Sequence, residues 1–310
     1  MTLFSNIPDK SSFKNPVVTI GNFDGVHAGH RKILEALRVK AEYMNGDPLV
    51  VTFEAHPKKI LNPDNAPKII TTTDEKVRIL TAMGFTNIIL LNFTKAMANM
   101  NASDFYNHLL VGKLGVREIV IGYDHAFGKN REGNMDFLLE LARETGIGVT
   151  RVDEEIIDGK PVSSTWLRHA IMAGNFVEAN RLLTRNYSLS GMVVQGAGRG
   201  RILGFPTANI RPDDPDKIIP ADGVYAVTVC FENGGTRHGM LNIGNNPTFE
   251  NMDRSIEVNI FDFSDDIYGK PVTIEFHRKL RDEVRFGSAE ELIEQIKRDR
   301  DDARAVLKNI

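Results

Sequence analysis

The sequence has little cysteine, little tryptophan and no long apolar run. Its 310 residues include one cysteine and one tryptophan. The single cysteine, Cys230, excludes an intrachain disulfide and fits a reducing compartment, and its place in the apolar run YAVTVCF predicts a core-filling role. No apolar segment approaches the roughly 18 residues needed to cross a bilayer, and the N-terminal stretch MTLFSNIPDKSSFK lacks the apolar centre of a signal peptide. We therefore expect a soluble protein that stays in the cytoplasm.

Neither sign of charge is in large excess. The chain has 38 lysines and arginines against 41 aspartates and glutamates, which gives a formal net charge of -3 and a pI near 6.3. This balance excludes binding to nucleic acid or anionic lipid through bulk charge, so that any basic site must be local. The 42% of hydrophobic residues is enough to build a core in each of two domains.

Strand-like runs alternate with helical patterns through the first part of the chain. The runs PVVTI, PLVVTF, NIILLNF, REIVIG and GVTRV are separated by amphipathic segments such as HRKILEALRVKAEYM and DEKVRILTAMGF. This rhythm predicts a Rossmann-like α/β fold with a parallel sheet. Thr72 and Glu75 predict a capping box at a helix start. Two short helices follow, with Gly174 predicted as the stop of one and Asn175 as the start of the next.

The pattern changes at Tyr187 to alternating strands separated by Gly, Asn and Pro turns. Within this part, ENGGT predicts a hairpin turn, and Ser288 with Glu291 predicts the start of a terminal helix. We expect a small antiparallel β-barrel with a C-terminal helix. The predicted domains are residues 1–186 and 187–310.

The stretch TIGNFDGVHAGH, residues 19–30, joins an apolar strand to a helix. A glycine-rich turn at such a junction lets backbone N–H groups and the positive end of the helix approach a phosphate. The glycines match neither the dinucleotide fingerprint nor the P-loop. His27 and His30, separated by Ala28 and Gly29, can instead donate to one phosphoryl group. A zinc site, which lacks a third ligand at a recognisable spacing, and two ordinary surface histidines are the alternatives.

The stretch GAGRGRILGFPTANI, residues 196–210, is a second glycine-dense segment beside basic residues. Thr207 and Asn209 alternate along an extended segment and therefore face the same way, and hydroxyl and amide oxygens suit Mg²⁺. A turn followed by an edge strand is the alternative. Further on, Glu257 shares a strand face with Asn259, opposite an apolar face, and from the pattern alone a solvated strand glutamate is the simpler interpretation.

Both stretches resemble the signatures of a known family. GNFDGVHAGH resembles the H-x-G-H signature of the nucleotidyltransferase superfamily. Together with VVTFEAHP, IVIGYDHAFGKNREG and VSSTWLR it is similar to the adenylyltransferase module of bacterial bifunctional riboflavin kinase/FAD synthetases. GRGRILGFPTAN resembles the riboflavin kinase signature G-R-x-x-G-F-P-T-A-N, and PADGVYAV, NIGNNPTF, IEVNIFDF, DIYGKPVTIEF and LRDEVRF resemble the remaining kinase blocks. The resemblance covers nearly the whole chain in order.

The resemblance implies two consecutive reactions that use ATP and Mg²⁺. Riboflavin is phosphorylated to FMN, and FMN is then adenylylated to FAD with release of pyrophosphate. Flavin is then a substrate and not a redox cofactor, and the implied partners are the small molecules riboflavin, FMN and ATP, with no nucleic acid and no membrane. The alternatives are a kinase with an impaired adenylyltransferase module and a non-catalytic flavin- or nucleotide-binding protein. The histidine pair and Glu257 favour catalysis, because a carrier needs neither.

The resemblance also implies residue roles. His27 and His30 stabilise charge at the α-phosphate of ATP, Asp124 contacts a flavin phosphate or a metal unless it is only a turn cap, and Glu257 acts as the base of the kinase. The implied ATP-binding set of the adenylyltransferase is Gly21, Asn22, Phe23, Gly25, His27, His30, Ser164, Thr165 and Arg168. The implied ATP-binding set of the kinase is Gly198, Gly200, Gly204, Thr207 and Asn209, with Thr207 and Asn209 also binding the metal.

Three residues in two motifs depart from the family pattern. Trp166 stands where the family usually has a basic residue, and His125 with Ala126 replaces the commoner phenylalanine followed by a basic residue. Trp166 either packs against the barrel or stacks on a ring. The sequence leaves both interpretations open.

Overall fold

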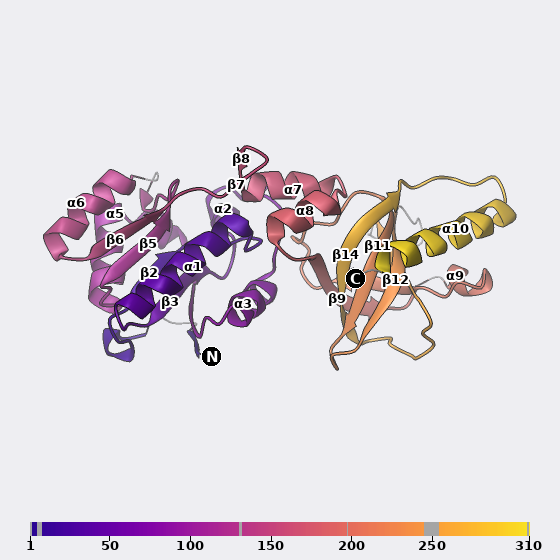
Figure 1. Ribbon diagram of the computed structural model, residues 1–310, viewed down its shortest axis with the longest axis horizontal. Coiled ribbons are helices and arrows are strands. Elements are labelled where there is room, and N and C mark those ends of the chain that lie inside the picture. Colours follow the sequence, from indigo (N-terminus) through magenta and orange to yellow (C-terminus); the bar gives the residue numbers. More distant parts are fainter. Residues whose placement is uncertain (1, 5–7, 130–131, 197, 245–253, 309) are drawn as a thin grey trace. The chain divides into compact units, whose positions relative to one another are not determined.

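The structure is a computed structural model that describes all residues except 1, 5–7, 130–131, 197, 245–253 and 309 (Figure 1). Part of the block NIGNNPTF, from residue 245 onward, therefore lies outside the described residues. The chain divides into two compact units, residues 1–164 and 165–310. The limits of the compact units do not show to which functional domain residues 165–186 belong. The domain limits 1–186 and 187–310 therefore stay a prediction.

A six-stranded parallel sheet forms the centre of the first unit, in the order β1-β4-β3-β2-β5-β6. Its strands are β1 (Thr2–Phe4), β2 (Val17–Ile20), β3 (Pro48–Phe53), β4 (Asn87–Leu91), β5 (Glu118–Gly122) and β6 (Gly148–Val152). The five longer strands confirm the predicted Rossmann-like fold. The edge strand β1 was not predicted, because three residues carry no readable periodicity.

Helices cover both faces of this sheet, because successive strand residues point to opposite sides. Val17 and Val50 pack with Leu34 and Leu37 on one face, while Val18 belongs to the core on the other. The helices are α1 (Ala28–Tyr43), α2 (Pro57–Leu61), α3 (Thr73–Ala82), α4 (Lys95–Ala98), α5 (Ala102–Asp104), the π-helix η3 (Phe105–Lys113) and α6 (Met135–Thr145), with short turns η1 (Lys10–Ser12) and η2 (Pro63–Asn65) and the hairpin β7 (Ile156–Ile157) and β8 (Lys160–Pro161). The predicted capping box is present at the start of α3.

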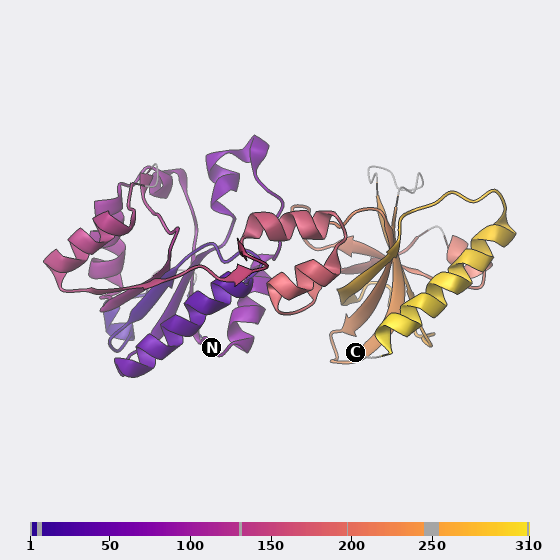
Figure 2. The same cartoon turned by 45° about the horizontal axis from the view of Figure 1, so that its top comes forward.

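The second unit is a closed antiparallel barrel in the order β10-β13-β12-β11-β14-β9. Its elements are α7 (Ser164–Met172, of which Ser164 belongs to the first unit), α8 (Phe176–Leu183), β9 (Tyr187–Val194), α9 (Arg199–Ile202), β10 (Ala208–Pro212), β11 (Gly223–Phe231), β12 (Thr236–Gly244), β13 (Ser255–Ile260), β14 (Pro271–Arg281) and α10 (Ala289–Leu307). Ser288 caps α10, and Figure 2 shows this helix lying along the outside of the barrel strands. The predicted barrel, hairpin and terminal helix are confirmed.

An aromatic cluster joins α8 to the barrel. The ring of Phe176 lies 4.7 Å from that of Phe276, 5.6 Å from that of Tyr225 and 5.9 Å from that of Tyr187. Asn175 caps α8 as predicted. These contacts anchor α8 to the barrel.

Two candidate active sites

The glycine-rich turn lies where the strand order of the parallel sheet reverses. β2 has β3 on one side and β5 on the other. Connections that leave neighbouring strands in opposite directions open a crevice at the carboxyl ends of those strands, which is where open α/β sheets bind ligands. The turn follows β2, and the exposed Asp124 follows β5. The fold therefore brings Asp124 to the same sheet edge as the histidine pair.

His27 is the N-cap of α1. Its Nδ1 accepts the backbone N–H of His30 at 3.3 Å. In a neutral imidazole, an accepting Nδ1 leaves the proton on Nε2, so that Nε2 is the donor. The rings of His27 and His30 are stacked, with centroids 3.6 Å apart, and the edge of Phe23 contacts His30 at 5.3 Å. The predicted pair is thus held together at the positive end of a helix.

The backbone of this turn is strained. Phe23 has φ 50°, Gly25 has φ 86° and Val26 has φ 41°. A β-branched residue such as valine rarely adopts the left-handed region, and such a conformation costs on the order of 1–3 kcal/mol. The surrounding contacts must therefore hold the turn.

Asp24 is one of the anchors of the turn. Its carboxylate is buried, and Oδ1 accepts the backbone N–H groups of Ile70 at 2.9 Å and Thr71 at 3.0 Å. The N–H of Gly25 in turn donates to Oγ1 of Thr71 at 3.0 Å. Sequence reasoning missed Asp24 and Thr71, because partners 46 or 47 positions apart leave no local signal.

Lys76 is a second anchor that sequence reasoning missed. Its side chain is buried on α3, and Nζ donates to the carbonyl oxygens of Phe53 at 2.7 Å and Asn22 at 3.2 Å. Oγ1 of Thr52 donates to the same Asn22 oxygen at 3.2 Å. Burial lowers the pKa of Lys76 to about 8, and the nearby carboxylate of Asp24 partly opposes this change.

The serine of the predicted triphosphate loop has a partner in the turn. Oγ of Ser164 donates to the backbone carbonyl of Asp24 at 3.1 Å. Thr165, Trp166 and Arg168 belong to α7 in the second unit. The roles of Thr165 and Arg168 in binding triphosphate, and both interpretations of Trp166, stay predictions.

The barrel brings Thr207, Asn209 and Glu257 together. β10 and β13 are neighbours, and Asn209 lies opposite Glu257 in the register. Oγ1 of Thr207 donates to Oε2 of Glu257 at 3.1 Å, and Nδ2 of Asn259 donates to the carbonyl of Pro206 at 2.7 Å. Glu257 and Asn259 therefore both reach the segment that precedes β10, which agrees with the face assigned to them from the strand pattern.

Asn209 presents a buried acceptor. Its side chain is 6% exposed, and Oδ1 has no hydrogen-bond partner among the described residues. A buried amide oxygen without a partner is costly, and a hydroxyl, an amide oxygen and a carboxylate together form an oxygen donor set that fits Mg²⁺. The described part of the chain holds no cluster of three or more His, Cys, Asp or Glu placed to bind a metal. The side-chain oxygens that lie together at this site are those of Thr207, Asn209 and Glu257.

The glycine loop folds closely against this donor set. A Cβ at Gly196 would lie 2.0 Å from Nδ2 of Asn209, and one at Gly200 would lie 2.4 Å from the carbonyl oxygen of Phe205. Gly198 and Gly204 have φ of 68° and 82°, which favours glycine. Gly196 lies in the glycine-dense segment, but no sequence pattern indicates its close approach to Asn209.

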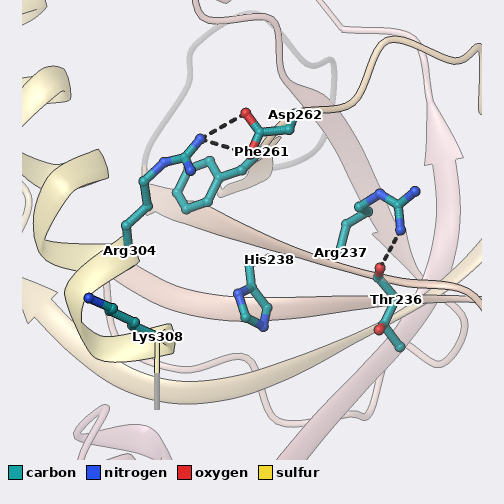
Figure 3. A pocket seen from close by; sticks show the side chains of 7 residues that line it. All are labelled: Thr236, Arg237, His238, Phe261, Asp262, Arg304 and Lys308. Carbon is teal, nitrogen blue, oxygen red and sulfur yellow. Dashed lines mark hydrogen bonds and ion pairs between the residues drawn. The ribbon is translucent and has the colours of Figure 1, made fainter. Parts of the chain in front are cut away.

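A separate pocket of about 470 Å³ is lined by the start of β12, the turn after β13 and the C-terminal end of α10 (Figure 3). Arg304 donates to both carboxylate oxygens of Asp262, at 2.9 and 3.0 Å, and packs over the ring of Phe261. The lining residues are Thr236, Arg237, His238, Phe261, Asp262, Arg304 and Lys308. None of the predicted kinase residues is among them, so this pocket is not the predicted kinase site.

The fold and the two sites define a class. The first unit is Rossmann-like and has a histidine pair at a helix N-terminus. The barrel of the same chain combines a glycine loop, an oxygen donor set and a carboxylate. This combination is typical of a nucleotide-dependent transferase.

Comparisons with known proteins identify the family. The family model for FAD synthetase matches residues 9–166, and that for riboflavin kinase matches residues 183–307. Proteins named bifunctional riboflavin kinase/FMN adenylyltransferase are 36% identical in Haemophilus influenzae, covering 93% of each chain, and 36% identical in Escherichia coli K12, covering 91% of this chain and 90% of that one. The protein of that name in Bacillus subtilis is 35% identical and covers 95% of this chain and 93% of its own. The chain belongs to the bifunctional riboflavin kinase/FMN adenylyltransferase family: it phosphorylates riboflavin to FMN and adenylylates FMN to FAD.

A solved structure has the same fold over nearly its full length. The crystal structure of a Streptococcus pneumoniae chain, described as a macrolide-efflux protein, is 32% identical, covers 98% of both chains and has a TM-score of 0.86. Among the described residues of the present chain, no helix is both long and apolar enough to span a membrane. The efflux description is that of the Streptococcus pneumoniae protein.

Proposed function

We propose that the two reactions are divided between the two sites. Riboflavin phosphorylation takes place at Thr207, Asn209 and Glu257 in residues 187–310, and FMN adenylylation takes place at His27 and His30 in residues 1–186. The observation that carries the proposal is the hydrogen bond from Thr207 to Glu257 beside the buried Oδ1 of Asn209. The enzyme works in the cytoplasm on small-molecule substrates.

In the kinase, Glu257 is the base. The 5′-hydroxyl of riboflavin is a poor nucleophile and must lose a proton as it attacks the γ-phosphate of ATP, and a carboxylate can accept that proton. Thr207 and Asn209 hold Mg²⁺-ATP, and Gly198, Gly200 and Gly204 let the loop backbone approach the phosphates. Bound Mg²⁺ supplies neutralisation of phosphate charge.

In the adenylyltransferase, no base is needed. The attacking phosphate of FMN is already ionised near neutral pH, so catalysis depends on positioning and charge stabilisation. His27 donates from Nε2 to the α-phosphate, beside His30 and the positive end of α1. The remaining ATP contacts come from Gly21, Asn22, Phe23, Gly25, Ser164, Thr165 and Arg168, and Asp124 contacts the flavin phosphate or the metal.

Two variants test this division. Glu257→Gln keeps an oxygen that accepts from Thr207 but removes the base, and we expect riboflavin phosphorylation to fall by about 10²- to 10⁴-fold. His27→Asn keeps a good N-cap for α1 but removes Nε2, and we expect FMN adenylylation to fall by about 10²- to 10³-fold. Chromatography of the flavins, starting from riboflavin or from FMN, separates the two activities.

The matched control is Glu232→Gln, which changes the same charge at an exposed hairpin position. We expect this variant to keep both activities. The division is wrong if a folded Glu257→Gln or His27→Asn protein loses both reactions together, or if either variant leaves its assigned reaction at the wild-type rate.

A further inference from the structure

Lys76 makes contacts that neither proposed reaction explains. It lies at the fourth residue of α3, its side chain is 5% exposed, and its ammonium is bound by two backbone carbonyl oxygens. One carbonyl, that of Phe53, ends β3, and the other, that of Asn22, follows the end of β2. Lys76 thus joins the carboxyl ends of two neighbouring parallel strands.

The site of this contact is the start of the strained turn. Asn22 directly precedes Phe23, whose φ is 50°, and the turn then runs through Asp24 to His27. On its far side the turn is fixed by the contacts of Asp24 with Ile70 and Thr71. Lys76 and Asp24 therefore hold the two sides of the segment that presents His27.

Packing alone does not explain a lysine at this position. A methionine of similar length would fill the same space without desolvating a charge, and burial of the ammonium is the main cause that lowers the pKa of Lys76. Strain of the kind seen at Phe23 and Val26 persists only where surrounding contacts over-determine the backbone. The charge is thus kept at a cost, in a place where backbone geometry sets the position of a catalytic donor.

We propose that Lys76 is a positioning residue for FMN adenylylation, and that its ammonium, by binding the Asn22 and Phe53 carbonyls, fixes the turn that aims Nε2 of His27 at the α-phosphate. The proposal rests on the site assignment made above for His27. Lys76 does not contact the substrates in this role and acts through the turn.

The carboxylate of Asp24, on the turn, acts on the ammonium of Lys76. Glu75, the preceding residue on α3, accepts the backbone N–H of Thr72 at 2.9 Å. The third element, β3, contributes the Phe53 carbonyl. Burial lowers the pKa of Lys76 to about 8, so Lys76 changes charge near this pH.

The first test is Lys76→Met in the full-length chain. We expect kcat for FMN adenylylation to fall by about 10- to 100-fold, because displacements of about 1 Å at a catalytic group have effects of this size. The KM for FMN should change little, which reports that the first unit is folded, and riboflavin phosphorylation, in the second unit, should be unchanged. The matched control is Lys113→Met, which removes an exposed lysine at the end of η3. Adenylylation by Lys76→Met within twofold of the wild type would overturn the proposal.

The second test uses a readout that a merely structural role would not move. In the wild type, kcat for adenylylation should fall as pH rises through about 8, where Lys76 loses its charge. In Lys76→Arg, which stays charged, this alkaline fall should be absent or moved to higher pH. This variant decides the question if Lys76→Met does not fold, and a wild-type alkaline fall in Lys76→Arg would overturn the proposal.

Two outcomes separate the assignment of His27 from the role of Lys76. If His27→Asn keeps full adenylylation, the site assignment itself is wrong. If His27→Asn loses adenylylation while Lys76→Met does not, only the positioning role of Lys76 is wrong.

Discussion

Substitution of Gly196 by alanine should damage the kinase site through one contact. The added Cβ would lie 2.0 Å from Nδ2 and 2.6 Å from Cγ of Asn209. Non-bonded heavy atoms in such contacts stay beyond about 3 Å, so the Asn209 amide must move by about 1 Å or the loop must lift by as much. Asn209 is buried and offers Oδ1 to the proposed Mg²⁺-ATP, so a shift of about 1 Å should cost about 10²-fold in riboflavin phosphorylation.

The assay is the initial rate of FMN formation from riboflavin across a series of Mg²⁺-ATP concentrations. We expect kcat/KM for Mg²⁺-ATP to fall by about 10²-fold in Gly196→Ala, with FMN adenylylation unchanged in the same preparation. The control is Gly287→Ala, where the nearest atom to the new Cβ, Oε2 of Glu291, is at an ordinary distance of 3.4 Å. Wild-type kinase activity in Gly196→Ala would refute the reasoning that the loop and Asn209 form one site.

Two further predictions concern stability. Phe176→Ala removes a fully buried ring that contacts three other rings. We expect the free energy of unfolding of the second unit, measured by urea titration, to fall by about 3–5 kcal/mol. A loss below about 1 kcal/mol would contradict the role given to the aromatic cluster. Lys76 has a pKa of about 8 when folded against the ordinary 10.5, so between these values the native state binds fewer protons than the unfolded state. The cost of burying its charge is therefore present below pH 8 and disappears as pH rises, and the free energy of unfolding of the wild type should rise relative to Lys76→Met by about 3 kcal/mol between pH 8 and pH 10.5. A difference that does not change with pH would show that the charge of Lys76 is not buried.

The parts of the fold that the sequence predicted are those with local causes. The capping box of Thr72 and Glu75 and the cap at Ser288 each depend on residues three positions apart. The parallel strands and the barrel followed from hydrophobic periodicity and turn residues. The π-helix Phe105–Lys113 could not be distinguished from an α-helix in the sequence, because its wider turn has no distinct sequence pattern.

The candidate sites divide in the same way. His27 with His30, and Thr207 with Asn209, lie on short segments whose geometry the sequence pattern already constrains. The residues that anchor these segments are distant in the sequence. Nζ of Lys76, for example, donates to the carbonyl oxygen of Asn22, 54 positions away. Such contacts depend on how the strands and helices pack, so no pattern in the single sequence could predict them.

The measurement that tests the account most directly combines the two variants that separate the reactions. Glu257→Gln alone should leave riboflavin unconverted, and His27→Asn alone should stop at FMN. Mixed together with riboflavin, ATP and Mg²⁺, the two proteins should form FAD, because each supplies the site that the other lacks. A mixture that stops at FMN, or either variant alone forming FAD from riboflavin at the wild-type rate, would contradict the claim that this chain carries two separate sites for two consecutive reactions.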